Sequence, residues 1–222
     1  SGNGLDATYY GGGGGGGGGS WGKGGDGYKG LVIIRYKIKK IFEDVTSLFQ
    51  PQFYTMKEKP QITSGPVAQV TDSYVMGSDM YKYMMFKYDA TNDNGSNQTE
   101  YALNFSKDTN VDILIVAGGG AGGVDNGSGG GGGGVLYATD IQLNGSYNIK
   151  VGKGGLPTTN LDASYNTTHY SENGYDSEFG KLGDILVVKG GGYGGNANNS
   201  TAEGTDYPGG DGGSGGGGSY SS

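Results

Sequence analysis

One glycine pattern in the chain has the spacing of a cofactor-binding motif. Gly118, Gly120 and Gly123 follow an apolar run, and Asp140 lies near the distance expected for an acid that binds ribose. Dinucleotide binding also needs a helix after the glycines, because its N-terminus holds the pyrophosphate. The residues that follow are mostly glycine, and each glycine costs a helix about 1 kcal/mol against alanine. The sequence therefore does not predict dinucleotide binding.

Residues for catalysis are equally sparse. His169 is the single histidine, so any Ser-His-Asp triad must use it, and the residues around it have loop composition. Gly212, Ser214 and Gly216 match Gly-x-Ser-x-Gly, but no strand-to-helix turn surrounds them. We expect no enzyme and no cofactor.

A hard cation is the remaining chemical candidate. Asp26, Asp206 and Asp211 lie in glycine-rich turns that offer carboxylates and carbonyls to calcium. Their spacing fits neither the helix-loop-helix calcium site nor the nonapeptide repeat, and aspartate next to glycine also simply forms turns. The chain has no cysteine for disulfides or thiolate metal sites.

Composition limits both the fold and the partners. The chain has 222 residues, 52 glycines and a formal charge of −7, with a local basic cluster only at Lys37, Lys39 and Lys40. Nucleic-acid binding needs clustered cations, and no apolar run is long enough to span a membrane, so neither is expected. Because glycine has no side chain to bury, order must come from backbone hydrogen bonds, close backbone approach, tyrosine packing or neighbouring chains. The start at Ser1 without a signal-like segment suggests a chain that is processed or cut from something longer.

Asparagine chemistry indicates the compartment. Asn-x-Ser/Thr acceptors for N-linked glycans occur at eight positions: Asn94, Asn97, Asn104, Asn126, Asn144, Asn166, Asn198 and Asn199. Asn, Gly and Ser also mark turns, which explains part of this abundance. We expect several of these sites to carry glycans, and hence a secreted protein or one on a virion surface.

The first 73 residues fall into four stretches of different composition. A glycine-rich stretch to residue 30 precedes an apolar, β-branched strand at 31–36. A short amphipathic helix is predicted next, and an extended linker follows it to residue 73. The apolar residues of the predicted strand and helix are Leu31, Val32, Ile33, Ile34, Tyr36, Ile38, Ile41, Phe42, Val45, Leu48 and Phe49.

The rest of the chain reads as short strands separated by glycine. Residues 81–88 have strand composition, although Met84-Met85 also suits a short helix, and 101–105 is the expected partner strand across a polar turn. Further strands are predicted at 112–117, 135–140, 147–151 and 184–189. The fold class is all-β, and the spacing suits a glycine-rich, β-sandwich-like domain. The alternative for the glycine tracts is packed polyproline-II-type helices, because glycine lets backbones approach closely.

The run Val111 to Gly123 resembles the glycine-rich domain of fibre, tail and surface proteins in phages and giant viruses, with relatives in microbial eukaryotes. The resemblance continues through residues 129–137, 145–155 and 174–180. Members of that family typically close with a Tyr-Tyr-Gly-rich tract and a Val-Ile-Ile-Arg-Tyr strand. Here those closing elements, 9–19 and 32–36, come first.

This order predicts three regions. Residues 1–36 are a tail and closing strand, 37–73 the helix and linker, and 74–222 the main β domain. Either the chain is one period of a longer repeat, or the closing strand is donated to a neighbouring protomer; the alternative is that it folds back within its own chain. The first two arrangements give head-to-tail contacts and a filament, with the helix docked at the joint.

The function expected from the sequence is therefore structural. We expect a protomer of an N-glycosylated extracellular filament or fibre that polymerises with itself. The alternative is an adhesin or receptor-binding module of a virion or tail fibre, since loops carry recognition on such scaffolds.

Overall fold

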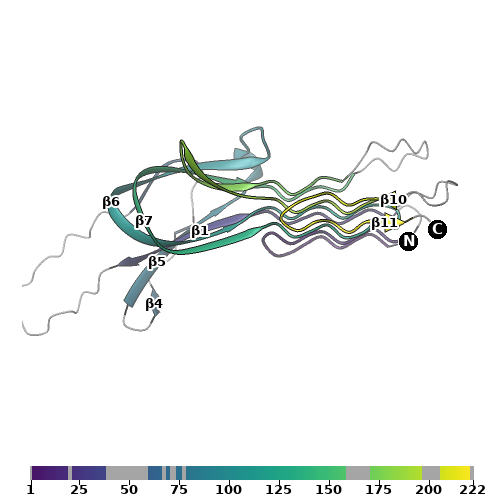
Figure 1. The fold of residues 1–222 in the computed structure, drawn as a ribbon, viewed down its shortest axis with the longest axis horizontal. Coiled ribbons are helices and arrows are strands. Elements are labelled where there is room, and N and C mark those ends of the chain that lie inside the picture. The colour runs from purple at the N-terminus through teal and green to yellow at the C-terminus, as the bar shows by residue number, and fades with distance from the viewer. Residues whose placement is uncertain are drawn as a thin grey trace, which may run out of the picture.

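A computed structural model describes residues 2–19, 22–38, 60–66, 69–70, 74–76, 79–158, 171–196 and 206–220. Figure 1 shows a curved β-sheet at one end and a bundle of extended glycine-rich segments at the other, with both chain ends at the far tip of the bundle. The one helix among these residues is the short 3-10 turn η1 (Ala90–Asn92). No described helix has the length and hydrophobicity needed to cross a membrane.

The sheet is antiparallel and contains nine strands, seven of them in the order β3-β5-β1-β6-β7-β8-β9. β2 pairs with β6, and β4 pairs with β5. A separate pair, β10 (Asp206–Tyr207) and β11 (Ser219–Tyr220), lies at the tip of the bundle. The bounds of the sheet strands are β1 Leu31–Ile38, β2 Gln61–Ser64, β3 Gln69–Val70, β4 Tyr74–Met76, β5 Asp79–Lys87, β6 Gln98–Val116, β7 Val135–Gly152, β8 Ser177–Lys181 and β9 Asp184–Val188.

Two long strands, β6 and β7, run through the whole sheet and bend it. Their register shifts between Phe105 and Thr109 and again between Val111 and Ile113. Bulges of this kind kink a strand and increase its twist. The first part of β6 pairs with the last part of β7, and the second part of β6 pairs with the first part of β7 and with β1. One continuous sheet therefore presents two halves to each other, and the expected sandwich of two separate sheets is not confirmed.

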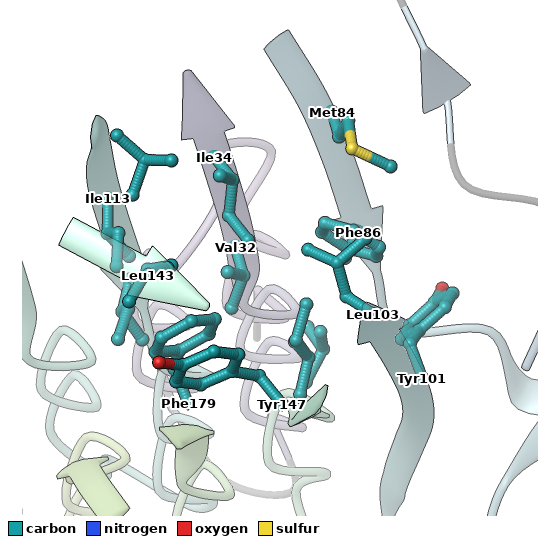
Figure 2. Packing of buried hydrophobic residues seen from close by; sticks show 14 of the residues in the cluster. Val32, Ile34, Met84, Phe86, Tyr101, Leu103, Ile113, Leu143, Tyr147 and Phe179 are labelled. Carbon is teal, nitrogen blue, oxygen red and sulfur yellow. The ribbon is translucent and has the colours of Figure 1, made fainter. Parts of the chain in front are cut away.

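The hydrophobic core lies between these two halves (Figure 2). Val32 and Ile34 of β1 are fully buried, because alternate residues of a strand point to the same face. Phe86 of β5 meets Tyr101 of β6 edge to face, with ring centroids 5.1 Å apart, and Tyr147 stacks on Phe179 at 5.3 Å. Each fully buried side chain of this size stabilises the fold by about 1.5–3 kcal/mol.

Several predictions about local structure need correction. Residues 79–87 form a strand, so the helical alternative for this stretch is wrong. That strand faces the 101–105 segment across the core instead of pairing with it. The predicted strands 101–105 and 112–117 belong to the single strand β6, since the polar stretch between them is a bend and not a break. Strands 135–140 and 147–151 likewise merge in β7.

The predicted helix and linker lie largely outside the described residues. Ile38 is the exception, because it is the last residue of β1 and pairs with Met80. Ile41, Phe42, Val45, Leu48 and Phe49 are not described. Part of the linker is sheet: β2 pairs with β6, and β3 pairs with β5.

The glycine tracts form a bundle whose segments hydrogen-bond to each other at every third residue. From the segment 117–125, Gly119 and Gly122 donate to the Tyr28 and Gly25 carbonyls, and the next donor in that row is Asp125. Three residues per turn without internal hydrogen bonds is the geometry of polyproline II. The tract glycines have no positive φ except Gly11 and Gly19. We call this array the glycine bundle; its segments are 2–7, 11–19, 22–30, 117–125, 127–134, 152–156, 171–175, 189–196 and 209–218.

Segment 117–125 is the axis of the bundle, and hydrogen bonds link it to six neighbouring segments. Its amides donate to 22–30, 127–134 and 171–175, while its carbonyls accept from 11–19, 152–156 and 189–196. No direction around this segment is left open. A methyl group at Gly118, Gly119 or Gly120 would lie 1.9–2.1 Å from a carbonyl oxygen of a different neighbour. Glycine is required here because of close approach rather than because of unusual backbone angles.

The N-terminal residues complete both parts of the fold within this chain. β1 is a central strand between β5 and β6, and the glycine tract 11–19 lies against 117–125 in the bundle. Residues 2–38 thus fold back onto the rest of the same chain, which is the third of the arrangements considered above.

Glycine-to-alanine substitutions test the close packing of the bundle. We expect Gly119→Ala to lower the free energy of unfolding by at least about 3 kcal/mol, because its methyl group would overlap the Gly12 carbonyl oxygen at 1.9 Å. Gly132→Ala is the matched control, since the nearest atom to its methyl group is 3.5 Å away. The control should be neutral or up to about 1 kcal/mol more stable, because alanine restricts the unfolded chain. Urea unfolding measures both, and equal effects would contradict this packing.

Candidate functional site

Sheet and bundle join at one edge, where several strands end together. The pairs Leu31↔Lys87 and Leu31↔Val116 place the start of β1 beside the ends of β5 and β6. The fully buried Ser177 fastens this edge: its hydroxyl donates to the Val116 carbonyl at 3.0 Å and accepts from the Gly152 amide at 3.1 Å. Side chains at this edge are held by the sheet on one side and the bundle on the other.

A cavity of about 560 Å³ opens at this edge, and we call it the junction pocket. The bundle supplies one wall, and the end of β5 with the residues after it, Pro66 and Tyr101 near the start of β6 supply the other. Three lysines and three tyrosines dominate a lining of Gly27, Tyr28, Lys29, Pro66, Met85, Lys87, Tyr88, Asp89, Ala90, Tyr101, Lys153, Gly154 and Leu156.

Hydrogen bonds fix the tyrosines of the junction pocket. The Tyr88 hydroxyl donates to Asp93 Oδ2 at 2.8 Å, and the Tyr101 hydroxyl donates to the Lys87 carbonyl at 2.5 Å. Burial, together with the bond to Asp93, raises the pKa of Tyr88 to about 12. The same hydrogen bond holds the pKa of Asp93 below its usual value.

The carboxylate of Asp89 is occupied by its own loop. It caps η1, accepting from the Thr91 amide at 3.0 Å, the Thr91 hydroxyl at 2.8 Å and Asn92 Nδ2 at 2.8 Å. The Asn92 and Thr91 hydrogen bonds lower the pKa of Asp89. Asp89 is therefore ionised near neutral pH, and its oxygens already have donors.

Two lysines of the junction pocket, Lys29 and Lys153, have polar contacts through their ammonium groups. Lys29 Nζ donates to the Tyr88 carbonyl at 3.2 Å. Lys153 Nζ lies 3.5 Å from Asn97 Oδ1 and 3.9 Å from the Glu172 carboxylate. The Lys29 contact is an ordinary hydrogen bond, whereas both contacts of Lys153 are long.

A second cavity, of about 490 Å³, has three acidic residues in its lining, among them Glu172, the ion-pair partner of Lys153. We call it the acidic pocket. It is lined by Ser96, Gln98, Ser171, Glu172, Asn173, Gly174, Tyr175, Asp176, Glu178 and Tyr193.

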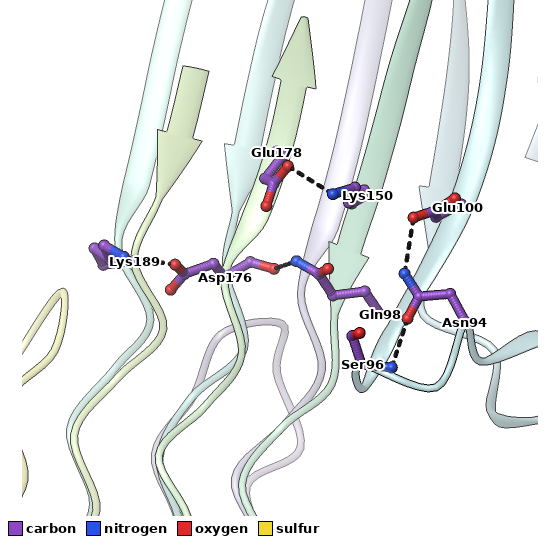
Figure 3. Close-up of polar contacts among 8 residues, drawn as sticks. All are labelled: Asn94, Ser96, Gln98, Glu100, Lys150, Asp176, Glu178 and Lys189. Atoms are coloured by element: carbon purple, nitrogen blue, oxygen red, sulfur yellow. Dashed lines mark hydrogen bonds and ion pairs between the residues drawn. The ribbon is translucent and has the colours of Figure 1, made fainter. Parts of the chain in front are cut away.

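Two of the three acidic groups of this second pocket, Asp176 and Glu178, are paired with lysines (Figure 3). Lys189 Nζ pairs with Asp176 at 2.8 Å, and Lys150 pairs with Glu178 at 3.2 Å. Gln98 Nε2 donates to the Asp176 carbonyl at 2.9 Å, which ties β6 to the start of β8. These contacts stabilise the wall of the pocket, and Glu172, its third acidic group, lies 3.9 Å from Lys153.

The residues that the sequence suggested for cofactor binding or catalysis form no common site among the described residues. Gly118, Gly120 and Gly123 form the bundle axis and open no helix. Ser214 exchanges backbone hydrogen bonds with Gly132 and Gly192, as an ordinary bundle residue. His169 lies outside the described residues.

The three aspartates proposed for calcium form no site among the described residues, where no group of three or more His, Cys, Asp or Glu is arranged to hold a metal. Asp26 is on the bundle, where burial and then the charge of Asp6 raise its pKa. The carbonyl of Asp211 accepts from Asn173 Nδ2 at 3.1 Å, and Asp206 belongs to β10.

The described sequon asparagines lie in turns or near strand bends. Asn94, Asn126 and Asn144 are exposed, whereas Asn97 and Asn104 are half-buried. The backbones of Asn97 and Asn126 have φ of 58° and 60°, a conformation that asparagine tolerates well. Asn166, Asn198 and Asn199 lie outside the described residues.

The predicted assembly strand is in the core of its own chain. Leu31, Val32, Ile34 and Tyr36 are buried, while Ile33 is half-buried on the outer face of the sheet.

The junction pocket was not predicted from the sequence. Its only sequence signal is the adjacent pair Tyr28-Lys29 before β1 and the pair Lys87-Tyr88 at the end of β5. Strand pairing brings these two pairs to the same edge, and no local pattern reveals that pairing.

The chain belongs to the glycine-rich domain family: the family model matches residues 95–222, more than half of its length. The matched region contains the bundle axis and the long strands β6 and β7, while β1 and the N-terminal glycine tract lie before it. Searches of curated proteins and of solved structures returned no match.

Removal of one hydroxyl tests the Tyr88–Asp93 contact. At pH 8 we expect Tyr88→Phe to cost about 1 kcal/mol of unfolding free energy, because a hydrogen bond is lost. The folded pKa of about 12 lies above the ordinary value of 10, so the contribution of Tyr88 is present below pH 10 and is lost as pH rises through 12. The difference between the two proteins should therefore shrink from pH 10 upward in denaturant titrations. A difference that is constant to pH 12 would contradict this assignment.

Proposed function

We propose that the chain is the structural protomer of an N-glycosylated extracellular filament or fibre, assembled head-to-tail by strand addition, and that it has no catalytic role. This proposal rests on the position of β1. This strand is central, with β5 on one side and β6 on the other, yet it reaches β2 only through residues 39–60.

A central strand on such a connection is suited to exchange between chains. The pairs of Leu31–Ile38 with β5 and β6 can form equally when residues 2–38 of one chain enter the sheet of the next. Each chain then gives one strand and receives one, which is a heterologous contact that extends into a fibre if it does not close into a ring. The main-chain hydrogen bonds of β1 supply the affinity, as in other strand-addition complexes.

The glycine bundle supports a mechanical role. Its segments run side by side along the long axis of the molecule, with hydrogen bonds between them at every third residue (Figure 1). Backbones so tightly cross-linked make a stiff rod, which suits a fibre subunit.

The alternative is an adhesin or receptor-binding module on a virion or tail fibre. In that case β1 remains in its own chain and the protein forms discrete particles. The pockets at the junction are the observation that favours it, because a purely structural rod needs none.

A disulfide reporter distinguishes the two. Ile33 and Leu114 are partners in the β1–β6 register, where antiparallel residues lie close enough for a disulfide. The chain has no cysteine of its own, so Ile33→Cys combined with Leu114→Cys gives an unambiguous bond. Truncation is unsuitable because β1 is part of the core.

Oxidised protein in the purified assemblies should run as a ladder of covalent oligomers on a non-reducing gel. Ile33→Cys alone is the control and should give no species larger than a dimer. A product that is entirely monomeric and internally linked would place β1 in its own chain and favour the adhesin function.

Glycan mapping tests the extracellular assignment. In protein made by a secretory host, we expect occupancy at the exposed Asn94, Asn126 and Asn144. Occupancy at Asn97 should be much lower, because this residue is half-buried and the Thr99 of its sequon is fully buried. Peptide mass spectrometry after enzymatic deglycosylation measures each site, and a chain without any glycan would contradict the assignment.

A further inference from the structure

The junction pocket concentrates positive charge in an acidic chain. Lys29, Lys87 and Lys153 line it, whereas the whole chain carries a formal charge of −7. The one carboxylate in the lining, Asp89, already accepts hydrogen bonds from the backbone amide and the hydroxyl of Thr91 and from the side-chain amide of Asn92. Glu172 lies outside the lining but is 3.9 Å from Lys153 Nζ, so an anion in the pocket would share Lys153 with it and would find Lys29 without a carboxylate in hydrogen-bond contact.

Lys29 and Lys153 retain N–H donors for such a ligand. An ammonium group has three N–H donors. Lys29 uses one of them on the Tyr88 carbonyl, and Lys153 has contacts of 3.5 and 3.9 Å. A carboxylate in the pocket would add charge-assisted hydrogen bonds to the donors that these contacts leave unused.

The remaining walls are aromatic and apolar. Tyr28, Tyr88 and Tyr101 contribute rings, and Met85 and Leu156 contribute aliphatic surface. The Tyr101 ring is fixed by its contact with Phe86 and the Tyr88 hydroxyl by Asp93. Rigid rings with a polar rim suit the C–H face of a sugar ring, and a volume of about 560 Å³ lies within the range of small-ligand pockets.

We propose that the junction pocket binds a carboxylate-bearing sugar, with lysine ammonium groups on the carboxylate and tyrosine rings against the sugar face. The sheet edge places both sets of residues, since Leu31↔Lys87 pairing brings Tyr28-Lys29 beside Lys87-Tyr88. In the single-chain fold one chain supplies every lining residue; in the fibre proposed above, Gly27, Tyr28 and Lys29 would come from the neighbouring chain.

Two methyl glycosides test the proposal on the intact protein. Methyl β-D-glucuronide and methyl β-D-glucoside differ only in the group on C5, which is a carboxylate in the first and a hydroxymethyl group in the second. By titration calorimetry or NMR shifts, we expect the glucuronide to bind saturably and the glucoside at least about tenfold more weakly, as for loss of one charge-assisted hydrogen bond.

Lysine variants assign the binding to the junction pocket. Lys87→Gln and Lys153→Gln should each weaken glucuronide binding about tenfold. Lys23→Gln should leave it unchanged, because Lys23 is exposed on the same bundle segment as Lys29 and does not line the pocket. Lys153→Arg keeps the charge and should retain binding, which separates loss of charge from loss of fold.

Inorganic sulfate separates a sugar site from a general anion site. Sulfate should compete only weakly at constant ionic strength. Sulfate that binds as tightly as the glucuronide would overturn the sugar assignment, and glucuronide binding that is absent or insensitive to Lys87→Gln and Lys153→Gln would overturn the site itself.

Discussion

The whole structure depends on the absence of a β-carbon along one extended segment. Residues 117–125 donate hydrogen bonds to three neighbouring segments and accept from three more, so backbone surrounds this segment on every side. Side chains at Gly118, Gly119 or Gly120 would enter space that a carbonyl oxygen already occupies. A chain with 52 glycines gives up much of the burial that side chains provide, and backbone hydrogen bonds between the glycine segments supply order instead. The hydrophobic contribution is concentrated instead in the bent sheet.

Sheet and bundle are parts of the same strands rather than separate domains. β1, β6, β7, β8 and β9 each continue directly into glycine segments, and Ser177 fixes the line where extended sheet geometry becomes polyproline II. The N-terminal residues belong to both parts, because they supply the central strand and the tract beside the axis. The position of β1 therefore links the sheet core to the bundle, and in the fibre that we propose the same strand would join one chain to the next. The junction also contains the lysine-lined pocket, which we propose as a binding site.

Local composition predicted the all-β class and the strands at 31–36, 112–117 and 184–189, because β-branched residues between glycines leave little alternative. It did not predict that β6 and β7 are continuous. The polar residues Ser106 to Asn110 contain no apolar alternation, and only the pairing of both flanks with one partner strand shows them to be a bend. Local composition also predicted that 81–88 pairs with 101–105, because segments close in sequence often form a hairpin. In the structure β1, which is distant in sequence, lies between β5 and β6 and pairs with both. For the same reason the junction pocket could not be read from the sequence: its residues come from five distant stretches that meet only after the sheet has formed.

Native-state hydrogen exchange at the bundle axis tests this account most directly. If 117–125 is hydrogen-bonded to six neighbours, the amides of Gly118 to Gly123 should exchange as slowly as those of β1 and β6, through global unfolding alone. Ordinary glycine-rich loops lack such protection. Exchange of these amides within seconds, while the sheet remains protected, would show that the glycine tracts are not a packed bundle and would remove the basis of the rod.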